Sequence, residues 1–173
     1  MRKHNGMRPH DVAVLLKIIT YKNVPWYITE LAKSLKISQS EISESLNRNR
    51  IAKLFNPNKK VVLKNSLLEF LIYGIKYVFP VFPGKVSMGI VTAHSAKPIS
   101  KFVNASDNVY VWACDDGDIK GQEIEPLYKN AVLVAREDKK LYRLLALVDA
   151  IRTGKAKVID LAEKELKKRI TKN

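Results

Sequence analysis

The stretch that decides the fold is Tyr27–Arg48, with the sequence YITELAKSLKISQSEISESLNR. It holds two short helical patterns, which are separated by Lys36 and Ile37. Within the patterns, apolar residues recur at the three- and four-residue spacing of one helix face, at Leu31, Leu35, Ile42 and Leu46. Ala32 is small enough to let two helices approach closely. The stretch therefore predicts two crossed helices that are joined by a tight turn.

The segments on either side extend this pattern. Upstream, apolar residues at helical spacing predict a first helix over Arg8–Tyr21, with Pro9 in its first turn. Ser38 followed by Glu41 predicts a capping box at the start of the third helix. Downstream, two β-rich runs, residues 51–55 and 59–63, flank the turn-prone residues 56–58. These two short strands would form a hairpin with a basic tip.

Residues 27–48 resemble the helix-turn-helix of bacterial and archaeal transcription factors, especially winged forms such as the MarR family, and with the two strands the resemblance reaches about Leu63. It implies a winged helix-turn-helix DNA-binding domain, to which we assign residues 1–78. Such turns commonly have Gly where this chain has Lys36. Either Lys36 adopts the left-handed conformation at some strain, or the turn has another geometry.

The resemblance also implies which side chains would contact double-stranded DNA. The helix that begins near Gln39 would enter the major groove, where amide, hydroxyl and carboxylate groups can hydrogen-bond to base edges. The residues placed to read bases are Gln39, Ser40, Ser43, Glu44 and Asn47. Those placed to bind phosphate are Thr29, Lys36, Ser38, Arg48, Arg50, Lys53, Lys59 and Lys60.

The charge of the chain agrees with a polyanionic partner. The formal net charge is +14, from 31 Lys and Arg against 17 Asp and Glu. Residues 1–65 hold 13 of the basic and 4 of the acidic side chains, so the positive charge is concentrated in the N-terminal part. A basic surface favours nucleic acid or anionic lipid, and charge alone does not choose between them.

The remainder, residues 79–173, is expected to form a mixed module. An Asp-Gly step at Asp116 and Gly117 lies between two β-rich runs and predicts a β-hairpin over residues 109–124. Residues 138–153 and 155–170 predict two amphipathic helices, with a stop at Gly154. The expected fold class is therefore α+β, mainly α: a winged helix-turn-helix followed by a hairpin and two C-terminal helices.

Before that module, an apolar helix is expected from Leu67 to about Tyr77, capped by Asn65 or Ser66. Four aromatic residues lie in or just after it, at Tyr73, Tyr77, Phe79 and Phe82. They could line a pocket or a partner surface, but we expect them in the core at the junction of the two parts.

The sequence offers little support for catalysis or cofactors. Cys114 is the single cysteine, which excludes an internal disulfide and a multi-cysteine zinc site. Asp115, Asp116 and Asp118 lack the later acid that an EF-hand needs, so we expect no metal site there. Neither of the Gly-rich phosphate-binding motifs occurs, and no nucleophile or acid–base set can be identified. We expect a protein that is not an enzyme and uses no cofactor.

Two functions fit these features. The first is a sequence-specific transcriptional regulator, a repressor or activator, that binds a palindromic operator as a homodimer, with the leucine-rich C-terminal helices as the dimer surface. The second is an antitoxin-like protein, in which the C-terminal module binds a partner protein; the overall arrangement is similar to that of AbiEi-type antitoxins. We expect a cytoplasmic protein with no membrane contact, because no apolar run approaches the roughly 20 residues that span a bilayer.

Overall fold

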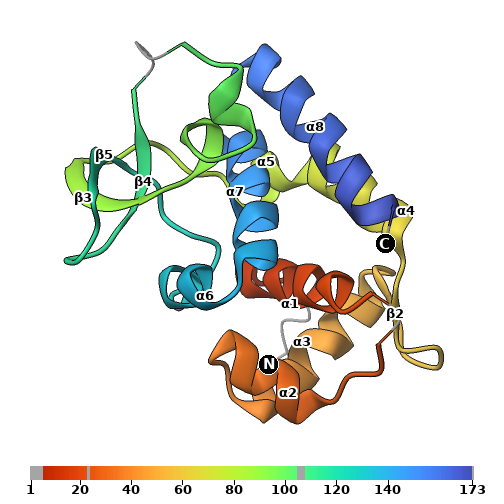
Figure 1. Ribbon diagram of the computed structural model, residues 1–173. Helices are drawn as coiled ribbons and strands as arrows, with labels where there is room; N and C mark the ends of the chain where they lie inside the picture. The colour runs from red at the N-terminus through yellow and green to blue at the C-terminus, as the bar shows by residue number, and fades with distance from the viewer. Residues whose placement is uncertain (1–5, 23, 105–107, 173) are drawn as a thin grey trace.

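The computed structural model describes residues 6–22, 24–104 and 108–172, and it is an α+β fold in which helices predominate (Figure 1). The α-helices are α1 (Pro9–Thr20), α2 (Ile28–Leu35), α3 (Gln39–Ile51), α4 (Lys64–Glu69), α5 (Ile75–Val78), α6 (Ala131–Glu137), α7 (Lys139–Thr153) and α8 (Ala156–Thr171). The strands are β1 (Phe55–Asn56), β2 (Val61–Val62), β3 (Val86–Val91), β4 (Tyr110–Ala113) and β5 (Ile119–Glu123). Short helical segments are η1 (Phe70–Gly74), η2 (Ala93–Ser95) and η3 (Ile99–Lys101).

The helices expected in the N-terminal part are confirmed. Helix α1 begins at Pro9, and the Asp11 carboxylate accepts the Arg8 backbone N–H at 2.8 Å. Helices α2 and α3 follow, and Lys36 between them has φ 55° and ψ 40°. The turn therefore uses the left-handed conformation that Gly would adopt at lower cost. It is closed by a hydrogen bond from the Ile37 N–H to the Ala32 carbonyl at 3.1 Å.

Two details of this part differ from the expectation. The Ser38 hydroxyl accepts the Glu41 N–H at 3.2 Å, but the returning half of the capping box does not form, because ion pairs hold the Glu41 carboxylate. The hairpin after α3 forms with Phe55 opposite Val62. Both strands are shorter than the expected runs: the first begins only at Phe55, because α3 continues to Ile51 before the chain turns, and the second is limited to Val61–Val62.

The helix after this hairpin runs through α4, η1 and α5, and it begins at Lys64, earlier than its expected caps. Its inner face fills the core with Leu67, Leu68, Leu71, Ile72 and Ile75. The core position expected for the aromatic residues is wrong for three of the four, because Tyr73, Tyr77 and Phe82 are 66%, 74% and 84% exposed. The leucines and isoleucines already fill the inner face, so the tyrosines lie on the outer one.

The β-hairpin expected over residues 109–124 is also wrong. Strand β3 pairs antiparallel with both β4 and β5, while β4 and β5 run parallel to each other. A two-residue Asp-Gly hairpin turn needs positive φ at its Gly, and no glycine of the described chain has one. Gly117 instead lies against the backbone of Gly89, where an added Cβ would come within 2.3 Å. Strand β3 itself lies between the apolar helix and the hairpin expected from the sequence, outside both.

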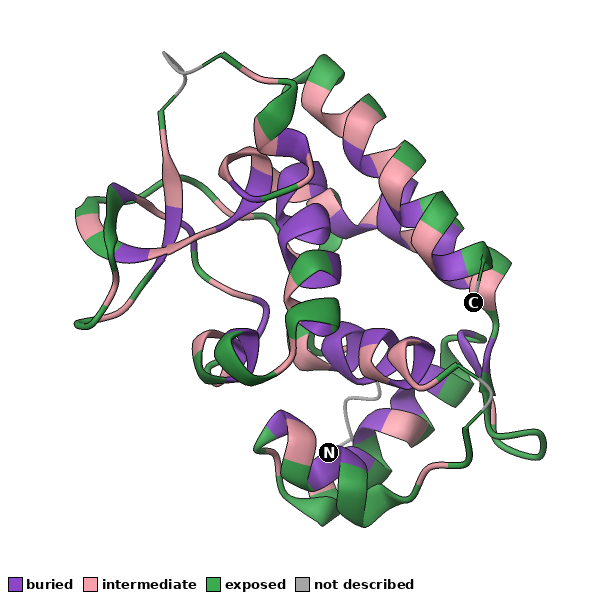
Figure 2. Cartoon of the chain, in the orientation of Figure 1, coloured by how far each residue is buried: buried purple, intermediate pink, exposed green. Residues whose placement is uncertain are grey.

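The two C-terminal helices form as expected, but their apolar faces are already covered. Helix α7 runs through the middle of the molecule and is buried along most of its length (Figure 2). Helix α8 packs against α7 and α4, and its inner face buries Ala162, Leu166 and Ile170. The leucine-rich faces therefore cannot serve as the dimer surface expected from the sequence.

One hydrophobic core joins the segments that the sequence divides at residue 78. It includes α1 residues such as Leu15 together with α7 residues such as Leu145. Polar contacts between described residues cross the same junction: the Lys17 ammonium pairs with Asp138 at 2.7 Å, the Lys36 ammonium pairs with Glu137 at 2.9 Å, and the Asn130 amide donates to the Lys36 carbonyl at 2.7 Å. Helices α1, α2 and α3 are therefore fixed against the C-terminal part.

Candidate nucleic-acid interface

The outer face of α3 carries the residues expected to read bases. Helix α3 buries Ile42 and Ser45 on its inner side, toward α1 and α2. The opposite face is exposed and consists of polar residues: Gln39, Ser40, Ser43, Glu44 and Asn47. The structure thus brings the whole expected set onto one open helix face, and none of these side chains lies in the core.

Local contacts give parts of this face a defined orientation. The Arg50 guanidinium donates to the Asn47 side-chain oxygen at 2.9 and 3.3 Å. This orients the Asn47 NH₂ group away from Arg50. The Ser43 hydroxyl donates to the Gln39 carbonyl at 3.1 Å. Amide and hydroxyl groups held in this way can exchange their partners for base edges.

A cleft of about 570 Å³ lies between the start of α2, the end of α3 and the hairpin β1–β2. Its wall includes the half-buried Trp26 ring, whose centroid is 6.1 Å from that of Phe55. Polar and basic groups line it beside the aromatic rings: Thr29, Asn47, Arg50 and Lys60. All four were expected to contact DNA, so the cleft connects the polar face of α3 with the hairpin.

A second hollow, of about 440 Å³, is also lined by Trp26 and Tyr27. Four lysines contribute to its wall: Lys22, Lys59, Lys60 and Lys64. Lys22, Trp26 and Tyr27 were not among the residues expected to contact DNA, although Tyr27 begins the stretch that resembles a helix-turn-helix. The juxtaposition of Pro25 and two aromatic residues with a basic hairpin was the available signal.

The cations of this surface differ in how far they are neutralised. Arg50, Lys59 and Lys60 are exposed, and no described carboxylate forms an ion pair with them. Lys36, by contrast, pairs with Glu137 of α6 at 2.9 Å. The other residues expected to bind phosphate, Arg48 excepted, are exposed at the ends of α2 and α3: Thr29, Ser38 and Lys53.

Arg48 is a correction to the expected phosphate-binding set. It is 5% exposed, and its guanidinium donates to the two carboxylate oxygens of Asp11 at 2.7 and 2.8 Å. A further bond reaches Glu41 at 2.5 Å. Arg48 lies on the inward side of α3, three residues after the buried Ser45. Its role is therefore to clamp α3 onto α1.

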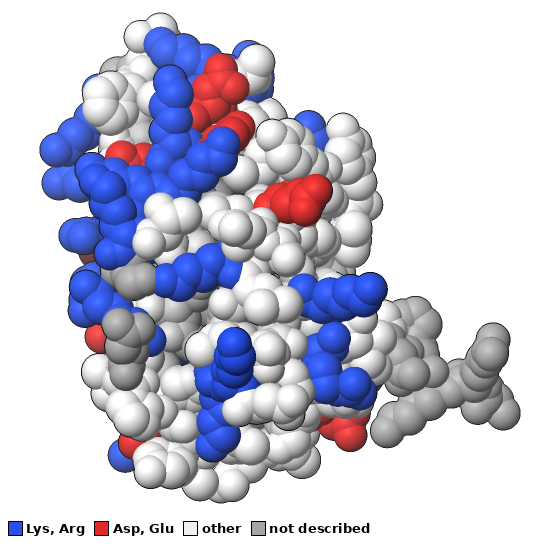
Figure 3. Space-filling model, turned by 90° about the vertical axis from the view of Figure 1, so that its right-hand side faces the viewer, with Lys and Arg blue, Asp and Glu red and all other residues white. Residues whose placement is uncertain are grey.

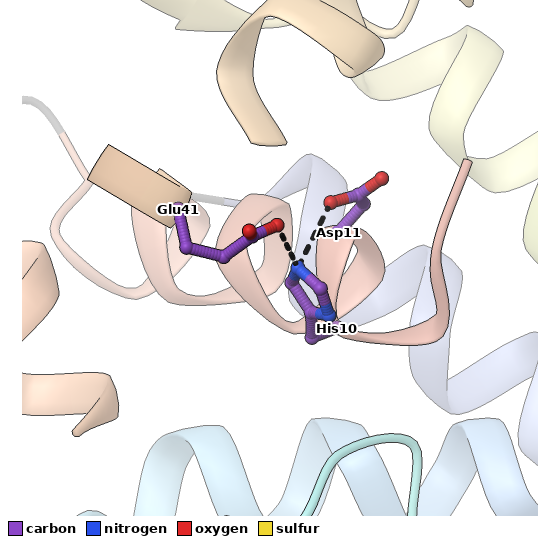
Figure 4. A group of neighbouring side chains, drawn as sticks. All are labelled: His10, Asp11 and Glu41. Carbon is purple, nitrogen blue, oxygen red and sulfur yellow. Dashed lines mark hydrogen bonds and ion pairs between the residues drawn. The ribbon is translucent and has the colours of Figure 1, made fainter. Parts of the chain in front are cut away.

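The neighbours of Arg48 form a compact polar cluster, in which His10, Asp11 and Glu41 approach one another (Figure 4). The His10 Nε2 atom is 2.8 Å from Glu41 and 3.5 Å from Asp11. Three such ligands could in principle hold a cation, but the Arg48 guanidinium already lies within 3.2 Å of all three. The cluster therefore fits an ion-pair network better than a metal site.

This network makes the stability of the protein depend on pH. Burial acts to raise the pKa of Glu41, but hydrogen bonds from Arg48 and His10 outweigh it and lower the pKa below 4.5. A carboxyl group whose pKa is lowered by folding stabilises the fold at pH values above its pKa in the unfolded chain. That stabilisation is lost as the pH falls through the pKa of the group in the folded protein. We expect the melting temperature to decrease as the pH is lowered from about 4.5. In Glu41→Gln the decrease between pH 6 and pH 3, measured by circular dichroism, should be smaller; an unchanged profile would contradict the assignment.

Positive charge extends beyond α3 and the hairpin. Figure 3 views the side that carries α8 and β2, and Lys and Arg predominate over Asp and Glu on it. On α8 the exposed lysines include Lys157, Lys164 and Lys168, which recur on one face of the helix. The basic surface therefore continues past the hairpin.

Comparison of the chain with protein-family models, with curated proteins and with solved structures gives no match. Within the described ranges, none of the helices has the length and apolar character needed to cross a membrane.

Proposed function

We propose that this protein is a sequence-specific regulator that binds double-stranded DNA as a winged helix-turn-helix, with α3 in the major groove and the hairpin β1–β2 as the wing. The observation that carries the proposal is the exposed polar face of α3 beside Arg50, Lys59 and Lys60, which form no ion pair with a described carboxylate. A helix with such a face suits base edges, and adjacent cations suit the phosphates that border the groove.

The hollows lined by Trp26 and Tyr27 support a specific path for the DNA backbone. A strand that leaves the groove at Asn47 would cross the 570 Å³ cleft between Thr29 and Lys60. Its sugars would contact the aromatic wall and its phosphates the basic rim. The lysines of the wing would then lie over the next groove.

The proposal is tested by variants that separate affinity from specificity. A preferred duplex is first selected from a random library, and binding is then measured by fluorescence anisotropy at several salt concentrations. Lys60→Ala should weaken binding to all duplexes and reduce the slope of log K against log salt by about 0.9, the value for one phosphate contact. Gln39→Ala should reduce the preference for the selected duplex over one with a changed base pair, by about 1–3 kcal/mol.

The matched control is Lys140→Ala, which removes an exposed lysine from the start of α7. It should leave both the affinity and the salt slope unchanged. The proposal fails if wild-type protein selects no duplex, or if Gln39→Ala and Lys60→Ala both bind as the wild type does.

A further inference from the structure

The outer face of the helix that runs through α4, η1 and α5 carries a cluster of exposed apolar side chains. Tyr73, Tyr77 and Val78 are exposed on it, and Phe82 follows just beyond its end. Large apolar side chains that cluster in the open are typical of surfaces that bind a partner, and tyrosine is enriched among the residues that dominate such binding. The polar face of α3 is formed by other residues, so this cluster is separate from it.

Two opposite charges lie on either side of Tyr73 along the chain, and Tyr77 follows the second of them. Glu69 is exposed and lines a shallow hollow together with Tyr73, and the Lys76 ammonium lies 5.0 Å from the centroid of the Tyr77 ring. Neither charge forms an ion pair with another described residue. Glu69 precedes Tyr73 by four residues and Lys76 follows it by three. A negative and a positive group therefore lie on opposite sides of Tyr73 along the chain.

We propose that this face binds a second copy of the chain, with the two helices antiparallel and a two-fold axis near Tyr73. In that arrangement Glu69 of each copy lies opposite Lys76 of the other, Tyr73 packs between these two ion pairs, and Tyr77 packs just outside them. A two-fold interface brings the same patch of both subunits together, so it requires a surface that is complementary to itself. A negative and a positive group on opposite sides of a central tyrosine meet this requirement.

The charges favour a second copy over other occupants. A polyanion such as DNA would meet the exposed Glu69 carboxylate, and so would an acidic protein. The chain carries a net charge of +14, so two copies repel each other unless opposite charges meet at the contact. The apolar faces of α7 and α8 offer no competing surface, because they are buried within the chain.

The contact must extend beyond one helix, since a stable interface covers about 800 Å² on each partner. The shallow hollow, of about 550 Å³, continues the surface from Glu69 and Tyr73 to Met7 and Phe70, and Lys53 of the expected phosphate-binding set also lines it. The dimer itself does not depend on DNA binding. Only its use, to present two copies of α3 to two half-sites, rests on the proposed function.

The test is the molar mass of the full chain, measured by sedimentation equilibrium between 1 and 100 µM. Wild-type protein should be dimeric within this range. Tyr73→Ser and Tyr77→Ser should each raise the dimer dissociation constant at least tenfold. Leu133→Ser, which removes an exposed apolar side chain from α6, is the control and should leave it unchanged.

A charge exchange tests the orientation. Glu69→Lys and Lys76→Glu should each weaken the dimer, because like charges then meet, and the double variant should restore it. Circular dichroism confirms that each variant is folded. A wild-type monomer at 100 µM, or tyrosine variants that dimerise normally, would overturn the inference; single charge variants without effect, or a double variant without rescue, would overturn the antiparallel pairing. DNA affinity, measured separately, decides the proposed function whatever the mass shows.

Discussion

Replacement of Arg48 by Ala should lower the free energy of unfolding by about 3–5 kcal/mol, the usual cost of removing one partner from a buried ion pair. The reason is that Asp11 is fully buried and would lose the guanidinium that now bonds to both of its oxygens. Urea unfolding, followed by circular dichroism at pH 7, measures the change. The clamp between α1 and α3 would be lost with it.

The matched control is Arg50→Ala, because Arg50 lies on the same helix but is exposed. Its effect on stability should stay within about 0.5 kcal/mol. The effects on DNA binding should be in the reverse order. Arg50→Ala removes a proposed phosphate contact, whereas Arg48→Ala, measured where it is still folded, should leave the salt slope unchanged. An Arg48→Ala protein as stable as the wild type would contradict the role assigned to this residue.

Replacement of Asp149 by Ala should have an effect of similar size, about 3–5 kcal/mol. Its fully buried carboxylate accepts hydrogen bonds from Thr92 at 2.9 Å and Trp112 at 2.7 Å, and it pairs with Arg152 at 2.7 Å. Burial raises the pKa of Asp149, and these three partners oppose that shift by stabilising the charged form. Without the carboxylate, all three donors would be buried or half-buried with a partner missing.

Asp149→Asn separates the charge from the hydrogen bonds. The amide keeps an oxygen that can accept from Trp112 or Thr92 but loses the ion pair with Arg152, so the loss of stability should be smaller than for Ala. Chemical unfolding gives both values, and the near-ultraviolet spectrum reports on the packing of Trp112. Equal losses for the two variants would show that the hydrogen bonds contribute little.

The sequence predicted the helices well because their signals are local. Apolar spacing located α1, α2, α3, α7 and α8, and the outward position of Gln39 and Asn47 followed from the inward position of Ile42. The left-handed turn at Lys36 was one of two geometries expected there, because the position is one where such turns commonly have Gly.

The errors arose where distant segments decide the outcome. Whether Arg48 meets solvent or Asp11 depends on how α3 crosses α1, since 37 residues separate the two partners in the chain. The pairing of β3 with both β4 and β5 depends on the close approach of Gly117 to Gly89, which no local pattern reveals. Local chemistry at the Asp-Gly step favoured a hairpin, and the packing of the sheet overrode it.

Helix α1 has a consequence for how this protein is built. It contacts both α3 and α7, so the same short helix packs against the N-terminal helices and against the C-terminal part. The helices that would read DNA thus supply only part of the hydrophobic core that holds them in place. They cannot be exchanged between proteins as a self-sufficient unit, and a change to a buried α7 residue in the shared core, such as Leu145, would also affect the packing of α1 on which α3 depends.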